Sequence, residues 1–433
     1  MNNPILARAY GAWSGAADFR SRRERYKRFT YGDQWCDPVA DGKGAVITER
    51  ESIERSGKRP YTNNLIRRLV KSVVGRYRNA AAEKGLYGGD IADAAARNAL
   101  AELDARLLEE FLISGSAVQR IVDERRWGGR GVWVDNVDPR RFFVNNFRDP
   151  RGWDVDMAGM LHDMSMPELI NRFGMGERRR VEKLRRLFDS NSGDRAYAGA
   201  TALGTAAAMN DFFIADSPDR LRVVEVWTFD SRPAPRSASL RFAWHCRMFA
   251  PDGTVLAEYD SPYGHAGHPF AIKYYPLTDG EVHSFVEDVL DQQKFINRLI
   301  VTLDHIVACS AKGVLLFPVD QLPKNVSWSD VAATWAQADG IIPVTGRGAV
   351  MPQQVNGAGT NGGAYQLLQL QMRLLEEVSG VGDALMGRTD GSARGAEMLA
   401  AQVQNATIAL ADLFESFTSF TTARNAKLLA TAA

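Results

Sequence analysis

The chain has 433 residues, of which 45% are hydrophobic and 24% are charged. This length and apolar content suit an ordered protein with about two to four structural units rather than a disordered tail. The formal net charge is +1, so any contact with nucleic acid must come from a local arrangement of charge. Cys36, Cys246 and Cys309 lack the paired spacing of a zinc ribbon or disulfide framework, which favours a reducing compartment.

The N-terminal sequence MNNPILARAYGAW has no apolar signal core, and no stretch reaches the roughly 18 apolar residues that a membrane span requires. We therefore expect a protein without a signal peptide or a membrane-spanning helix. Residues 1–30 are predicted to be helical, and they are strongly basic between Arg20 and Arg28. Such a run is typical of a solvated helix face or a subunit contact, although it could also meet DNA phosphates.

Two further helices and a hairpin are predicted next. Residues 62–77 place apolar side chains on one face with a period of about 3.6 residues, behind a cap at Thr62 or Asn63. A third helix is expected over residues 91–113. The runs 116–124 and 131–139 are strand-like, and WGGRG between them is typical of a hairpin turn.

The middle of the chain combines short helices with strands. Ser165 and Glu168 form a capping-box pattern, and Gly174 is expected to end the helix that they begin. A basic helix over 176–188 precedes a small, polar stretch over 189–209, which we expect to be a mobile excursion. Three runs alternate like strands of an antiparallel sheet: 223–229, 239–250 and 254–259, and residues 269–276 close this strand-rich section.

A long helix decides the predicted architecture. Ser284 and Glu287 form a second capping box, and the apolar period then continues over 285–310, which corresponds to about 39 Å of helix. Residues 312–345 predict a strand, a short helix and a second strand. A glycine-rich stretch leads to a returning helix over 364–380, and the loop 379–398 precedes a final helix rich in alanine.

None of the enzymatic patterns is convincing. The segment GDALMGRT (382–389) has arginine where a phosphate-binding loop of the Walker A type needs lysine, and no buried strand precedes it. The acidic group at 287–291 lies in the first turns of a helix, where the helix dipole favours negative charge without catalysis. Four residues could be zinc ligands but lack a second paired set: His245, Cys246, His265 and His268. We therefore predict no catalytic residue, no bound metal and no cofactor.

The order of these parts resembles the portal proteins of tailed bacteriophages, which form the ring at one capsid vertex through which DNA enters and leaves. The similarity covers nearly the whole chain. It is carried by these segments: YGDQW (31–35) and RPYTNNLIRRLVKSVVGRYRN (59–79), SGSAVQRIVDE (114–124), VDPRRFF (137–143), MSMPELINRFG (164–174), and the two long runs 290–318 and 364–403.

The resemblance implies an α+β fold made of named parts. These are a wing (1–284), a first stem helix (285–311), a small α/β clip (312–363), a second stem helix (364–382), a tunnel loop (383–396) and a long tunnel helix (397–433). Portal chains commonly continue into a helical crown, which is minimal or missing in this sequence.

The glycine-rich loop would then project towards the channel axis. Its glycines permit a tight, mobile turn, and its cations and hydroxyl groups could meet passing phosphates without reading bases. The residues implied are Gly387, Arg388, Thr389, Asp390, Gly391, Ser392 and Arg394. Four stem residues are further candidates for facing the channel: Gln292, Lys294, Arg298 and Arg373.

The same resemblance implies the partners. The chain would assemble with itself into a closed ring, usually of twelve subunits in this family, and conduct double-stranded DNA without sequence preference. The ring would contact the major capsid protein, the terminase large subunit, and head-completion, adaptor and tail proteins, in the virion and, during assembly, in the host cytoplasm. Two alternatives stay open at this point: a capsid-associated scaffold protein without a channel, and a nucleotide-dependent enzyme that uses the loop 379–398.

Overall fold

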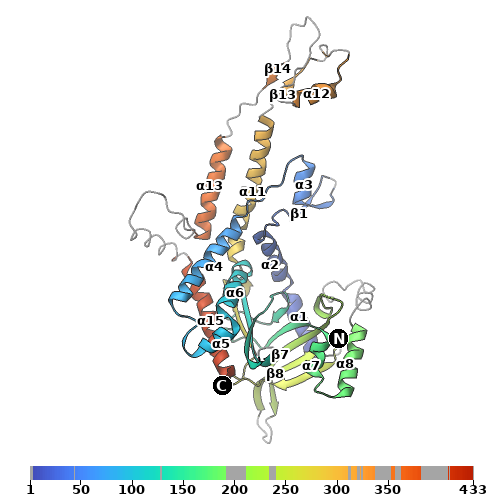
Figure 1. Ribbon diagram of the computed structural model, residues 1–433, viewed down its shortest axis with the longest axis vertical. Coiled ribbons are helices and arrows are strands. Elements are labelled where there is room, and N and C mark those ends of the chain that lie inside the picture. The colour runs from blue at the N-terminus through green and yellow to red at the C-terminus, as the bar shows by residue number, and fades with distance from the viewer. Residues whose placement is uncertain are drawn as a thin grey trace. The chain divides into compact units, whose positions relative to one another are not determined.

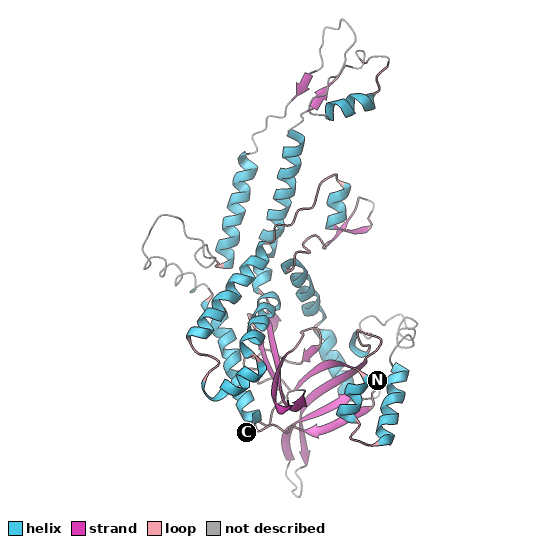
Figure 2. Cartoon of the chain, in the orientation of Figure 1, coloured by secondary structure: helices cyan, strands magenta, loops and turns pink. Residues whose placement is uncertain are grey.

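The computed structural model describes residues 3–42, 44–126, 129–191, 211–233, 240–310, 314–318, 322, 325–336, 353–355, 362–381, 408 and 410–432. The chain divides into two compact units, each assembled from separate stretches of sequence. Unit 1 comprises Met1–Tyr31, Ile66–Asp288 and Ser379–Ala433, and unit 2 comprises Gly32–Leu65 and Val289–Val378. Figures 1 and 2 show that helices and strands are mixed, so the α+β class is confirmed.

A five-stranded antiparallel sheet forms the centre of unit 1. Its strand order is β5-β6-β7-β8-β9, so each strand pairs with its neighbour in sequence. The strands are β5 (Phe142–Val144), β6 (Met157–Met164), β7 (Leu221–Pro233), β8 (Leu240–Phe249) and β9 (Val255–Asp260). Short connections join β7 to β8 and β8 to β9 and favour their pairing, whereas two helices lie between β6 and β7 in sequence.

Both faces of this sheet are buried, because side chains along β7 alternate between two apolar clusters. Val224 and Val226 pack on one face with Leu6 and Trp13 of helix α1 (Pro4–Gly15). Trp227 lies on the other face, in a cluster that also includes residues of the second sheet and of two short helices. These helices are α7 (Met166–Phe173) and α8 (Arg178–Asn191).

The second sheet of unit 1 has three strands in the order β10-β3-β4. Strand β3 (Ser116–Arg126) pairs with β4 (Gly129–Asn136), which confirms the predicted hairpin, and also with β10 (Phe270–Tyr274). The sequence pattern predicted a strand-rich section that closes at 269–276 but did not indicate the partner of this last strand. The structure pairs it with a strand about 150 residues earlier, a long-range choice that alternation cannot reveal.

The remaining helices of unit 1 are α2 (Ala17–Thr30), α4 (Leu65–Glu83), α5 (Ala92–Asn98), α6 (Leu100–Ser114) and α15 (Ala411–Ala432). The prediction of one helix over 91–113 is wrong, because Ala99 adopts a left-handed conformation with φ 48° and separates α5 from α6. The cause is a contact with another element: the Asn98 side chain accepts the N–H of Val134 and donates to the carbonyl of Val132, which draws it onto β4.

Unit 2 contains two long helices, α11 (Phe285–Ser310, whose first turn belongs to unit 1) and α13 (Gly362–Ser379). Strands β13 (Val314–Leu316) and β14 (Gln353–Val355) pair antiparallel, and α12 (Trp328–Ala336) lies between them in sequence. The predicted second strand near 341–345 lies outside the described residues. The stretch 32–65 adds β1 (Pro38–Ala40), β2 (Val46–Thr48) and α3 (Glu49–Arg55).

Both predicted capping boxes are present. The Glu168 carboxylate accepts the N–H of Ser165 at the start of α7, at 2.8 Å. At the start of α11, the Ser284 hydroxyl accepts the N–H of Glu287 and the Glu287 carboxylate accepts the N–H of Ser284. Local hydrogen bonds of this kind need only a few neighbouring residues, which explains why the sequence predicted them.

Candidate nucleic-acid channel

The loop predicted to meet DNA, from Gly387 to Arg394, lies outside the described residues, as do residues 382–400 as a whole. The structure describes the segment that leads into it. Helix α13 ends at Ser379, Gly380 has a left-handed φ of 65°, and Val381 is fully buried. The Ser379 hydroxyl accepts the N–H of Val381 at 3.2 Å, so the chain is held tightly where the loop begins.

Two of the four candidate stem residues form ion pairs within unit 2. The Lys294 ammonium lies 2.6 Å from a carboxylate oxygen of Asp37, and the Arg298 guanidinium lies 2.6 Å from one of Glu49. Glu49 is almost completely buried, whereas the side chain of Arg298 is 52% exposed. Each pair neutralises the charge that a passing phosphate would meet.

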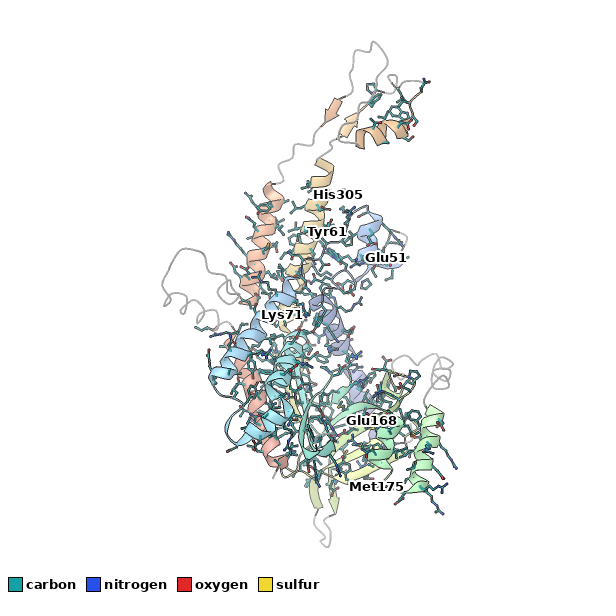
Figure 3. All side chains as sticks on the ribbon, viewed as in Figure 1. Glu51, Tyr61, Lys71, Glu168, Met175 and His305 are labelled. Atoms are coloured by element: carbon teal, nitrogen blue, oxygen red, sulfur yellow. The ribbon has the colours of Figure 1, made fainter. Side chains whose placement is uncertain are left out.

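The neighbouring residues of α11 form a buried polar cluster with the stretch 32–65. The Gln293 side chain accepts the N–H of Leu65 at 2.9 Å and donates to the carbonyl of Asn63 at 2.7 Å. The Asn297 side chain donates to Gln34 at 2.6 Å and accepts the N–H of Asn63 at 3.1 Å. Together with the two ion pairs, these hydrogen bonds attach the stretch 32–65 to α11. Figure 3 labels Glu51 and Tyr61, which belong to the stretch 32–65. We call this set of contacts the α11 clamp.

Gln292, the third candidate, is partly buried, and its side-chain oxygen has no hydrogen-bond partner among the described residues. Arg373, the fourth, is exposed on α13 and makes no ion pair with a described residue. Its helix has a one-sided polar surface. At about 100° per residue, the following positions lie on one side: Gln366, Gln369, Arg373 and Glu377.

Apolar residues occupy most of the rest of the α13 circumference, over more than half of the helix, with Gln371 as a polar residue among them. Only Leu375 on this apolar side is fully buried within the chain. Large side chains remain exposed to between 37% and 58%: Tyr365, Leu367, Leu370, Met372 and Val378. An apolar surface this wide on a helix of a folded chain is typical of a helix that is covered by further protein.

The C-terminal helix α15 is joined to the rest of unit 1 by a buried ion pair. The Arg424 guanidinium contacts both carboxylate oxygens of Asp104 on α6, at 3.0 and 2.9 Å, and donates to Gln119 of β3. Asp104 also accepts hydrogen bonds from Gln119 and from the Tyr87 hydroxyl. Since neither Arg424 nor Asp104 is exposed, the position of α15 on unit 1 is tightly specified.

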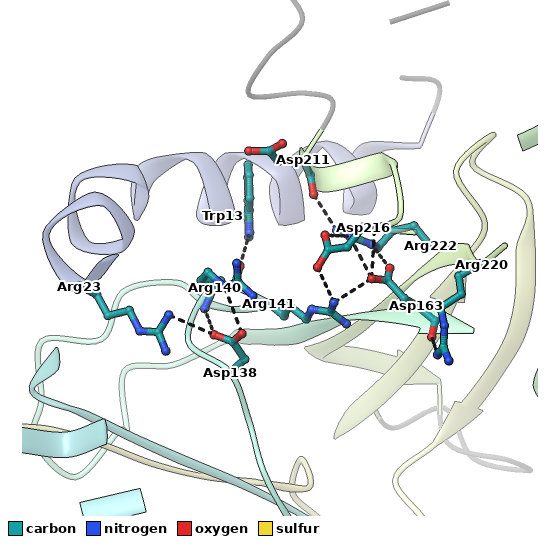
Figure 4. A network of polar contacts seen from close by, with 10 residues as sticks. All are labelled: Trp13, Arg23, Asp138, Arg140, Arg141, Asp163, Asp211, Asp216, Arg220 and Arg222. Carbon is teal, nitrogen blue, oxygen red and sulfur yellow. Dashed lines mark hydrogen bonds and ion pairs between the residues drawn. The ribbon is translucent and has the colours of Figure 1, made fainter. Parts of the chain in front are cut away.

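A second polar network, shown in Figure 4, links the paired ends of strands β6 and β7 in the large sheet. Arg222 of β7 is almost fully buried and binds Asp163 of β6 and Asp216. Arg141 bridges the same two carboxylates, at 2.9 and 2.6 Å. Because every buried charge in this network has a partner of opposite sign, its role is structural.

The basic run at Arg20–Arg28 is also used within unit 1. Arg23 is buried and binds the Glu110 carboxylate through two hydrogen bonds of 2.8 and 2.7 Å. Arg22 pairs with Glu287 at 3.7 Å. The sequence predicted a solvated helix face or a subunit contact for this run, but Arg23, which is buried, and Arg22 both pair within unit 1, and they give Glu110 and Glu287 structural partners.

The four histidine and cysteine residues considered as zinc ligands do not form a site. Within the part of the chain that the structure describes, no three His, Cys, Asp or Glu residues are grouped so that they could hold a metal ion. Cys246 is buried, and burial raises the pKa of its thiol well above the usual value. Among the described helices, none is long and apolar enough to cross a membrane.

Comparison with known families decides the class of protein. The family model described as phage P22-like portal protein matches residues 6–431, nearly the whole chain. The chain belongs to this portal protein family. No curated protein matches it significantly.

Membership makes the chain a bacteriophage portal protein with a head–tail connector role. The family is one of structural proteins, and it implies a homo-oligomeric ring at a capsid vertex, in contact with capsid and DNA. The exposed apolar surface of α13 is the feature of this portal protein that agrees most directly with a ring, because each subunit in a ring must contact two neighbours.

Proposed function

We propose that this portal protein forms a closed ring that conducts double-stranded DNA during genome packaging and ejection and performs no catalysis itself. The apolar surface of α13 carries the proposal. A head-to-tail ring places a different neighbour on each side of a subunit, so each subunit needs two contact surfaces, and one wide apolar surface on a single helix can contribute to both. Helix α13 has such a surface over more than half of its circumference, and most of it is exposed in the single chain.

The polar side of α13 is the surface that we assign to the channel. If neighbours cover the apolar side, the side with Gln366, Gln369, Arg373 and Glu377 remains for solvent or DNA. It carries one cation, Arg373, and the anion Glu377, and Glu376 lies about 20° beyond Gln369. Its net charge is therefore not positive, and it would bind phosphates only weakly. Weak binding suits a channel through which a motor must move DNA. Arg373 is our first candidate for DNA contact on the stem.

We assign the other parts by the family's organisation. The wing is 1–284, the stem helices are 285–311 and 364–382, the clip is 312–363, and the tunnel loop and helix are 383–396 and 397–433. The loop residues Arg388 and Arg394 would meet DNA phosphates, with Thr389 and Ser392 beside them. Lys294 and Arg298 are weaker candidates for DNA contact, because each already pairs with a carboxylate.

The proposed docking partners are the terminase large subunit, which would supply ATP hydrolysis, the major capsid protein, and head-completion, adaptor and tail proteins. Electron microscopy of the purified protein tests the ring. We expect closed particles, twelvefold in the simplest case, with an axial hole that admits duplex DNA of about 20 Å diameter, as its groove dimensions imply. Monomers or open filaments under several salt conditions would contradict the ring and favour the scaffold alternative.

The channel assignment needs its own test, with Arg373→Gln and a matched control. Arg106→Gln removes an exposed arginine of α6 in unit 1, where it pairs with Glu102. We expect rings from both variants, with a changed packaging rate or DNA retention only for Arg373→Gln. Equal packaging by both variants would contradict a role for Arg373 in the channel, and loss of rings would show that Arg373 acts in assembly instead.

A further inference from the structure

Unit 1 contains a cavity of about 510 Å³ that the channel proposal does not use. It lies between the segment that joins β5 to β6, strands β7, β8 and β10, and helix α15. Aromatic side chains form much of its wall: Phe147, Trp153, Phe229, Trp244 and Phe270. Trp153 is 76% exposed and Phe229 is 44% exposed, so the aromatic wall extends to the surface.

The cationic group in this cavity is Lys427 of α15. Its ammonium donates to the backbone carbonyls of His268 and Phe270, at 3.2 and 2.5 Å, which leaves one of its three protons for another acceptor. No carboxylate among the described residues forms an ion pair with it. Burial lowers the pKa of Lys427 to about 8, which reflects the cost of a cation held without a counter-ion.

Two histidines add further donors to the wall. Nδ1 of His265 accepts the N–H of Gly267 at 3.0 Å, and Nδ1 of His268 accepts the N–H of Phe270 at 3.2 Å. In neutral imidazole the proton is then on Nε2 of each ring, which makes each Nε2 a donor. Nε2 of His265 is buried and has no partner among the described residues.

Arg151 adds a second cation at the mouth of the cavity. Its guanidinium lies 4.0 Å from the centre of the Trp153 ring and binds Asp149. The lining residues include no aspartate or glutamate. The cavity therefore combines donors and positive charge with a wide aromatic wall, and it has no side-chain carboxylate of its own.

Glycine keeps the entrance of this cavity open. Gly152, which has φ 72°, lies where an added Cβ would be 3.2 Å from the Phe147 ring. At Gly267 an added Cβ would be 2.9 Å from Nδ1 of His265. A side chain at either position would disturb the wall that carries the aromatic and donor groups.

We propose that this cavity is a docking site for a segment of a partner protein that carries a carboxylate next to an aromatic or branched apolar side chain. The carboxylate would accept hydrogen bonds from Lys427 and His265, and the apolar side chain would pack against Trp153 and Trp244. Charge complementarity selects an anion, and the aromatic wall selects a peptide over a DNA phosphate, since duplex DNA presents its backbone without an apolar group beside it.

Binding at this cavity would also act on the C-terminal helix. Lys427 and Ala423 belong to α15, whereas the aromatic wall belongs to the sheets and to the segment before β6. A bound segment would therefore join α15 to β8 and to the segment before β6, and stabilise the position of α15. This inference does not depend on the DNA channel and goes beyond it.

The smallest probe with the required chemistry is N-acetyl-L-tryptophan, and its neutral amide is the matched comparison. Binding of both to the full-length assembled protein can be measured by calorimetry or ligand-observed NMR. We expect the anion to bind about tenfold more tightly than the amide, because charge-assisted hydrogen bonds are roughly twice as strong as neutral ones. Equal affinities, or no binding of either probe, would overturn the proposal.

Three variants locate the binding. Trp153→Ala should weaken binding of the anion by about three- to tenfold, and Lys427→Met should abolish the preference for the anion. Trp328→Ala removes a half-exposed tryptophan of unit 2 and should have no effect. An equal loss in Trp328→Ala would contradict the site. Binding by separated subunits that disappears on assembly would show an interface between copies of the chain instead of a partner site.

Discussion

Arg424 and Asp104 are about 320 residues apart in sequence and form an ion pair in which neither side chain is exposed to solvent. The two-pronged geometry satisfies both carboxylate oxygens, and Gln119 and Tyr87 complete the surroundings. Such a pair specifies where α15 lies on unit 1. Its loss would leave a buried charge without a partner.

We expect Arg424→Met to lower the free energy of unfolding by about 3–5 kcal/mol, as measured by chemical denaturation, because Asp104 would remain buried and unpaired. Adding Asp104→Leu to this variant should recover part of the loss, since no buried charge then remains. Arg106→Met breaks the exposed ion pair with Glu102 on α6, the helix that carries Asp104, and should lower the free energy of unfolding by at most about 1 kcal/mol. A double variant less stable than Arg424→Met would contradict the electrostatic explanation.

Buried histidines should make stability depend on pH. Burial lowers the pKa of His162 and of His268 in the folded protein below the usual 6.5. The unfolded chain therefore binds protons that the folded chain does not, and stability falls as the pH drops below about 6.5. Between pH 6.5 and 5 each histidine should cost at most about 2 kcal/mol.

Urea denaturation across this pH range measures the effect, and His268→Gln should remove its share of the slope. Glu225 acts at lower pH. Burial opposes ionisation of the Glu225 carboxylate, but Arg120 and His162 together hold its pKa well below the usual 4.5. Its contribution to stability is therefore present above pH 4.5 and is lost only as the pH falls below that value. A stability that stays constant between pH 7 and 5 would contradict the assignment of neutral, buried histidines.

Gly115 should tolerate no side chain. It ends α6 with φ 72°, and an added Cβ would lie 2.1 Å from the carbonyl oxygen of His283. We expect Gly115→Ala to lower the free energy of unfolding by more than about 2 kcal/mol. Gly75→Ala is the matched control inside α4. An added Cβ there would meet no atom within 4 Å beyond the backbone of its own helix, so this change should stabilise the protein by about 0.5–1 kcal/mol. Equal effects of the two changes would refute a steric cause.

The α11 clamp should protect the stretch 32–65 from proteolysis. Gln293→Leu leaves the N–H of Leu65 and the carbonyl of Asn63 without their side-chain partner, at a cost of about 1–3 kcal/mol. We expect trypsin to cleave this variant faster after Lys58 than it cleaves the original protein; the bond after Arg59 precedes Pro60 and resists trypsin. Gln366→Leu, an exposed change on α13, is the control. Unchanged cleavage in Gln293→Leu would show that the stretch is held by other contacts.

Local patterns in the sequence predicted much of the fold. The capping boxes at Ser165 and Ser284, the hairpin of β3 and β4, and the long helix after Ser284 all depend on residues close together in the chain. The broken helix at Ala99 was missed because its cause, the bonding of Asn98 to β4, is a contact between separate elements. No alternation of polar and apolar residues encodes that contact.

The stem shows the same division between local and distant interactions. Lys294 and Arg298 are cations on a long helix, and the sequence suggested them as residues facing DNA. Their carboxylate partners, Asp37 and Glu49, lie about 250 residues earlier, so nothing near them in the chain indicated that their charge is already neutralised. The cavity at Lys427 was not predicted either, because Lys427 lies about 160 residues after His265 and His268 and no local pattern brings them together.

The sequence by itself therefore determined most of the helices, the hairpin, the capping boxes and the family, since propensity, periodicity and the order of segments are properties of the chain. Only the tertiary structure decided which strands pair, which cations are neutralised and which donors surround a cavity. These depend on contacts across hundreds of residues, where many alternatives share the same local pattern and packing selects among them.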